Sequence, residues 1–153
     1  MTKVDERARV PALDGPARER LAAALDREGV VAAMIIGSQA SGHASPLSDV
    51  DVAVWVGDEL SDPERRTLRA RLHAAAVSTL RTDEVDLVIL NGTPPLLRHR
   101  ALRERVLLLD RDMERRVGLE VRAVLDYLDT APLRAARARA LRARLASGSF
   151  GRP

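Results

Sequence analysis

Three aspartates are the residues of this sequence whose type and spacing point most clearly to chemistry. Asp49 and Asp51 stand two residues apart at the start of the apolar run 50–56, and Asp86 lies inside a second apolar run, 84–90. Side chains two positions apart on a strand point to the same face, so Asp49 and Asp51 share a face. If the two apolar runs form neighbouring strands, Asp86 can join them there. An uncompensated charge in a buried strand costs several kcal/mol, so we expect something to compensate these carboxylates.

A divalent cation is the simplest compensation for three carboxylates at one place. Oxygen ligands favour Mg²⁺, or Mn²⁺ in its place, over zinc, so Asp49, Asp51 and Asp86 are the predicted metal ligands. Two such ions a few ångströms apart are the usual arrangement for moving a phosphoryl or nucleotidyl group. The alternative is that the aspartates serve as caps or as edge-strand charges that prevent aggregation.

A Gly-Ser pair ends the apolar run that precedes the aspartates. Gly37 allows a tight backbone turn after the run 30–36, and Ser38 adds a hydroxyl beside amides that can point at an anion. We therefore expect Gly37 and Ser38 to bind the phosphates of a nucleotide. Ser48, directly before Asp49, is expected to support the same nucleotide site.

The rest of the chain alternates between helical and strand patterns. Apolar runs predict strands at 30–36, 50–56, 84–90 and 106–110. Helical spacing and capping residues predict helices at 16–28, 61–80, 94–105, 112–129 and from Pro132 to about Ala146. The pattern predicts an α/β fold in which a small mixed sheet is flanked by helices. We expect one domain over residues 1–153, with C-terminal helices from about 112 to 146.

Composition limits the classes of function. The chain has 153 residues, 46% of them hydrophobic and 31% charged, which is typical of a globular domain. It contains no cysteine, which excludes disulfides and thiolate metal sites. The sequence predicts no membrane-spanning segment and no signal peptide, so we expect the protein in the cytoplasm. Aromatic residues make up only 2%, which argues against direct nucleic-acid binding.

Charge is distributed unevenly. All six charged residues from Ala131 to the end are arginines, whereas the preceding residues carry a net charge of −3. Such a basic segment indicates a partner surface or a phosphate-rich ligand, or else a solvated helix face.

The order of these motifs resembles a known superfamily. The stretch GSQASGHASPLSDVDVAV at 37–54, followed by EVDLVIL at 84–90, resembles the nucleotidyltransferases that include DNA polymerase β. The chain from about Leu21 to Ala140 is more narrowly similar to minimal nucleotidyltransferase (MNT) antitoxins. The resemblance implies that Asp49 and Asp51 bind both metals, and that Asp86 binds the catalytic metal and orients or deprotonates the attacking hydroxyl. All three aspartates would then be catalytic.

The resemblance also implies a substrate and a partner. It implies transfer of AMP from ATP to a tyrosine hydroxyl of a HEPN-type ribonuclease toxin, with which the chain is expected to assemble. One departure is Ser41, where many members carry an arginine on the phosphate side; Arg98 or the basic C-terminal segment could substitute for it. Two alternatives remain: a non-catalytic antitoxin that neutralises its toxin by binding, and nucleotidyl transfer to a small molecule such as an aminoglycoside.

Overall fold

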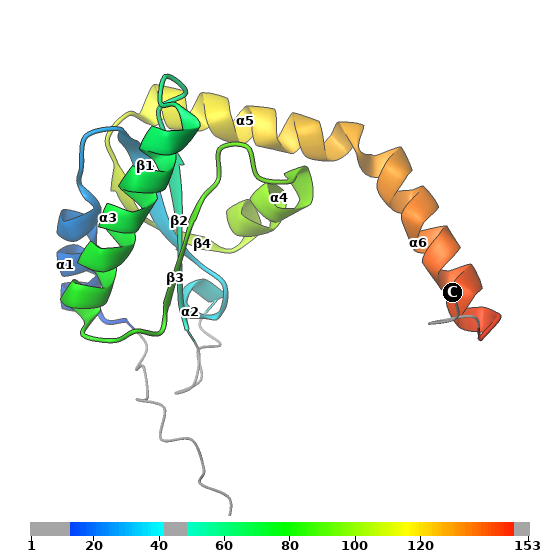
Figure 1. Cartoon of the computed structure of the whole chain (residues 1–153), viewed down its shortest axis with the longest axis horizontal. Coiled ribbons are helices and arrows are strands. Elements are labelled where there is room, and N and C mark those ends of the chain that lie inside the picture. The colour runs from blue at the N-terminus through cyan, green and yellow to red at the C-terminus, as the bar shows by residue number, and fades with distance from the viewer. Residues whose placement is uncertain (1–12, 42–48, 149–153) are drawn as a thin grey trace, which may run out of the picture.

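The computed structural model describes residues 13–41 and 49–148, which form a sheet with helices on both faces (Figure 1). The elements follow in the order α1 (Gly15–Leu25), β1 (Val30–Ile36), α2 (Ser38–Ser41), β2 (Val50–Val56), α3 (Asp62–Leu80), β3 (Val85–Ile89), α4 (Pro95–Arg103), β4 (Arg105–Asp110), α5 (Met113–Asp129) and α6 (Ala131–Ala146). The predicted α/β fold with a small mixed sheet is confirmed.

The sheet is mixed because it contains both antiparallel and parallel pairs of neighbouring strands. Its order is β3-β2-β1-β4, with β1 antiparallel to both neighbours and β2 parallel to β3. A parallel pair needs a crossover, and α3 supplies it. Two side chains of α3 also contact carbonyls of the edge strand β3: Arg69 Nε donates to Leu87 O over 2.8 Å, and His73 Nε2 lies 3.0 Å from Val85 O. These contacts cover polar groups that an open sheet edge would expose.

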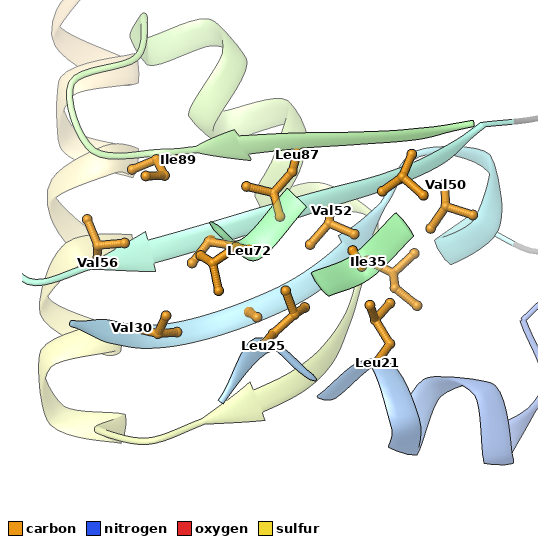
Figure 2. Packing of buried hydrophobic residues seen from close by; sticks show 14 of the residues in the cluster. Leu21, Leu25, Val30, Ile35, Val50, Val52, Val56, Leu72, Leu87 and Ile89 are labelled. Atoms are coloured by element: carbon orange, nitrogen blue, oxygen red, sulfur yellow. The ribbon is translucent and has the colours of Figure 1, made fainter. Parts of the chain in front are cut away.

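Apolar side chains pack on both faces of the sheet. On one face, Leu21 and Leu25 of α1 and Leu72 of α3 lie against the valines and isoleucines of the strands (Figure 2). On the other face, α4 and α5 cover a second cluster that contains Trp55, which is 1% exposed, and Ala123. Both faces of β1 and β2 are therefore buried, as their continuous apolar runs predict.

Helix boundaries follow the capping residues. Asp14 accepts a hydrogen bond from the Ala17 N–H at the start of α1, and the Glu64 carboxylate accepts one from the Ser61 N–H at the start of α3. The predicted end of the first helix near Glu28 is wrong, because α1 ends at Leu25. Gly29, with φ +85°, forms the turn into β1 instead.

The last helix leaves the body of the fold. α6 continues from the end of α5 and leads away from the sheet, and none of its residues is buried (Figure 1). It is tied to the fold through Tyr127, whose ring stacks on His99 with centroids 3.7 Å apart and lies 3.6 Å from the Arg134 guanidinium. Within residues 13–41 and 49–148, no helix has both the length and the hydropathy to span a membrane.

Candidate functional site

A single row of backbone pairs crosses the sheet and places the predicted carboxylates together. Asp51 of β2 pairs with Asp86 of β3, and on its other side with Ile36 of β1. Paired residues on neighbouring strands point to the same face, so both carboxylates project toward the face covered by α4 and α5. Asp49 lies one residue before β2 and, two positions from Asp51, shares its parity. The condition under which Asp86 can join the other two aspartates, that the apolar runs 50–56 and 84–90 form neighbouring strands, is met.

Gly37 brings the turn after β1 against this row. The residue has φ +71°, and a Cβ atom built on it would lie 2.6 Å from Asp51 Oδ2. No other residue type fits this position without strain and without moving the carboxylate. The Gly-Ser turn and the aspartates therefore meet at the same end of the strands, where β1 ends and β2 begins.

The environment of Asp51 raises its pKa above the ordinary value. Burial is the largest cause, since the side chain is only partly accessible, and repulsion from the Asp86 and Asp49 carboxylates adds to it. Asp49 and Asp86 are themselves exposed. Of the two aspartates that lie inside apolar runs, Asp51 is therefore only partly buried, and Asp86 is accessible because β3 is an edge strand.

The carboxylate oxygens of the site and their arrangement determine whether it can hold a metal ion. All three side chains offer carboxylate oxygens, and their mutual repulsion at Asp51 is what a hard cation would relieve. However, the part of the chain that the structure describes contains no group of three or more acidic, histidine or cysteine side chains close enough to hold a metal ion. The donor chemistry therefore fits Mg²⁺, whereas the side chains must converge further to coordinate it.

The other predicted site residues have different outcomes. Ser38 begins α2 directly after Gly37 and is half-buried, beside the aspartate row. Ser48 lies outside the described residues, so its expected role stays a prediction. Sequence reasoning missed Gln39, which is 4% exposed and whose Oε1 accepts a hydrogen bond from the Leu13 N–H at 3.2 Å. This bond fixes α2 to the segment before α1; no sequence signal distinguished it from the polar residues around it.

The structure also distinguishes between the arginines that could supply the positive charge that many family members carry at the position of Ser41. Arg98 is engaged in an ion pair with Asp126, with 2.9 Å between Nη2 and Oδ2. Arg105, by contrast, pairs with Ile36 and so stands in the same row as Asp51, on the other side of β1. Its guanidinium contacts Glu120 at 2.9 Å, and its side chain is 28% exposed. Arg105 is therefore the arginine that the sheet itself places beside the candidate site.

Comparison with known proteins gives one family match. The family model described as "Polymerase beta, Nucleotidyltransferase" matches residues 19–114, which include the Gly-Ser turn and all three aspartates. None of the curated proteins compared matches the chain.

Solved structures share the fold over most of the chain. A chain of a toxin–antitoxin complex with AMP-PNP has a TM-score of 0.66 and 21% identity, covering 81% of this chain and 97% of that one. A chain from the tri-AMPylated HEPN toxin of Shewanella oneidensis in complex with MNT antitoxin has a TM-score of 0.63 and 20% identity, covering 82% and 96%. At this identity the likeness is one of fold. A structure described as a candidate minimal nucleotidyltransferase reaches 32% identity with a TM-score of 0.50, over 60% of this chain and 88% of that one.

Proposed function

Because the chain belongs to the polymerase beta nucleotidyltransferase family, we propose that it transfers AMP from ATP to a tyrosine hydroxyl of a HEPN-type toxin and thereby acts as an antitoxin. The family match also bears out the nucleotidyltransferase class inferred from the sequence. The observation that carries the proposal is the pairing of Asp51 with Asp86 against the Gly37 turn. The finer claims draw support from the fold neighbours, of which one is a complex with AMP-PNP and another contains a tri-AMPylated HEPN toxin.

The proposed reaction assigns a role to each carboxylate. Asp49, Asp51 and Asp86 would hold Mg²⁺, which when bound supplies positive charge to the phosphates and to the attacking oxygen. The tyrosine oxygen forms a bond to the α-phosphorus of ATP, the bond from that phosphorus to the bridging oxygen breaks, and pyrophosphate leaves. Asp86, which is exposed, orients the hydroxyl or accepts its proton.

The phosphate side of the site is assigned to the Gly-Ser turn and one arginine. Gly37 and Ser38 would contact the β- and γ-phosphates, with Ser48 in support. Arg105 supplies the cation that Ser41 lacks, by exchanging its contact with the Glu120 carboxylate for a phosphate oxygen. Glu120 keeps Arg116 as a partner at 3.2 Å after this exchange, so it is not left as an unpaired charge.

Label transfer tests the proposal directly. The purified chain is incubated with α-labelled ATP, Mg²⁺ and the HEPN-type protein encoded in the adjacent reading frame, and label on that protein is measured. Asp49→Ala/Asp51→Ala should abolish the label, whereas Glu28→Ala, which removes an exposed acid at the opposite end of β1, should not. An unlabelled partner, or equal labelling by the aspartate variant, would contradict an enzymatic role.

A second function is favoured by one observation, the lack of a converged three-residue metal group among the described side chains. In that case the chain neutralises its toxin by binding alone. Growth rescue separates the two functions, because a binding antitoxin protects cells equally well when it carries Asp49→Ala/Asp51→Ala.

A further inference from the structure

Helix α5 turns its apolar side away from its own fold. Its exposed apolar residues, here called the α5 stripe, are each 40–66% exposed: Met113, Val117, Val121, Val124, Leu125 and Leu128. The opposite side of the helix packs Leu119 and Ala123 onto the sheet. An apolar stripe normally faces the core of its own domain. Exposed apolar patches of this kind usually mark an interaction site.

The stripe forms one wall of a groove whose other wall is α4. The cavity between the helices measures about 420 Å³, and half of its lining residues are apolar: Leu102, Val121, Val124 and Leu125. Arg105 also lines it, and Arg105 stands in the sheet row of Asp51. The α4–α5 groove therefore lies on the same face of the sheet as the candidate site, and one end of it reaches that row.

The charge on α6 restricts what can cover this surface. The helix carries five arginines and no acidic residue over Ala131–Ala146, together with leucines that are 48–59% exposed. Two copies of such a helix repel each other when they lie side by side, which disfavours a second copy of this chain as the occupant. Leu141 and Leu145 share their side of α6 with Arg134, so this helix has no broad apolar side to place in a membrane.

We propose that the α5 stripe and the α4–α5 groove bind the acceptor protein, through an apolar segment bordered by acidic residues that contact the arginines of α6. The identity of that acceptor rests on the proposed function. An apolar segment seated in the groove lies beside Arg105, which stands in the row of Asp51 with β1 between them, so docking there brings the partner close to the site where AMP is transferred. The chain thus holds its acceptor with α6 and with the side of α5 that its own core does not use.

Two sets of variants test the surface without touching the carboxylates. Val121→Asp/Leu125→Asp places charge on the stripe at positions that are 52% and 54% exposed, so the fold tolerates the change. Ala74→Asp introduces the same residue at an exposed position of α3, on the other face of the sheet, and is the matched control. Arg142→Glu/Arg144→Glu lowers the net charge of α6 from +5 to +1 and tests the acidic complement separately.

The measurement is the Kd of the adjacent HEPN-type protein for each variant, by titration calorimetry. We expect the stripe variant to weaken binding at least tenfold, the α6 variant to weaken it most at low salt, and Ala74→Asp to bind as the wild type does. Asp49→Ala/Asp51→Ala should bind normally while transferring no AMP. If the stripe variant loses binding but the wild type transfers no AMP, the docking surface stands and the proposed enzymatic function fails.

Three results would overturn the proposed surface. The first is unchanged affinity of the stripe variant for the HEPN-type protein, or no binding by the wild type. The second is a dimer of the isolated chain in sedimentation experiments that Val121→Asp/Leu125→Asp dissociates, which would make a second copy the occupant. The third is binding of the wild type, and not of the stripe variant, to anionic phospholipid vesicles.

Discussion

Replacing Gly37 by alanine should damage the site in two separable ways. The first is backbone strain, because φ +71° costs a residue with a Cβ about 1–2 kcal/mol. The second is a collision, because the new Cβ lies 2.6 Å from Asp51 Oδ2 and ordinary contact begins at 3.4 Å, so the carboxylate must retreat by about 0.8 Å. A displacement near 1 Å at a catalytic group can lower the rate by about a hundredfold.

A second glycine of the same chain separates these two effects. Gly92 has φ +78°, but a Cβ added to it would meet no atom within 4 Å, so Gly92→Ala carries the strain without the collision. Both variants should lower Tm by about 2–8 °C from strain alone, and Gly37→Ala by more. Only Gly37→Ala should lose AMP transfer. In an Asp51→Ala background the extra destabilisation by Gly37→Ala should disappear, which a double-mutant cycle measures.

Equal melting temperatures for Gly37→Ala and Gly92→Ala, with AMP transfer intact in both, would refute this reasoning. Such a result would mean that the Asp51 carboxylate does not lie against the turn in the working protein. Loss of transfer by Gly92→Ala would refute it differently, because the turn after β3 has no contact with the carboxylate row.

Three further predictions address the cation, the phosphate and a helix cap. Mg²⁺ should raise the Tm of the wild type and not that of Asp51→Asn. In EDTA, Asp51→Asn should have a higher Tm than the wild type, because the substitution relieves the repulsion between carboxylates. Thermal melts measure both effects. Arg105→Ala should weaken ATP binding about tenfold in titration calorimetry, whereas Arg100→Ala, on the exposed side of α4, should not. Hydrogen bonds from Ser61 lower the pKa of Glu64 from its ordinary value of 4.5, so ionised Glu64 stabilises α3 above that pH and loses the effect as pH falls through the lowered pKa. Urea denaturation should therefore find Glu64→Gln less stable than the wild type at pH 7 and nearly equal to it at strongly acidic pH.

The carboxylate row could be predicted because strand parity is a local property. The apolar runs set the strands, and alternation along a strand sets which face Asp49 and Asp51 share. The register that places Asp86 opposite Asp51 could not be predicted, since it depends on how the crossover helix α3 packs against β3 and α1. That the two strands are neighbours was left as a condition by the sequence.

Burial and orientation were harder to predict than the elements. The apolar neighbours of Asp86 suggested a buried side chain, but β3 is an edge strand and its carboxylate is exposed. Gln39 shows the reverse case, a polar residue in a polar stretch that is nonetheless buried because α2 folds back onto the segment before α1. In both cases the deciding contact comes from a segment distant in sequence.

The amphipathic pattern of α5 illustrates the same limit and gives it functional meaning. The period of Met113, Val117, Val121, Val124 and Leu128 predicts a helix with one apolar side, and that helix is present. The pattern does not predict which surface covers that apolar side. In the structure the apolar side faces away from the sheet, and the small residue Ala123 and the half-buried Leu119 pack against the sheet instead. Because the two clusters on the sheet close without the stripe, stability of this domain gives no reason for the stripe to be apolar. Binding of a second protein gives such a reason, because a binding surface must exclude water when its partner is bound. The α5 stripe lies on the helix that covers the face of the sheet carrying the aspartates.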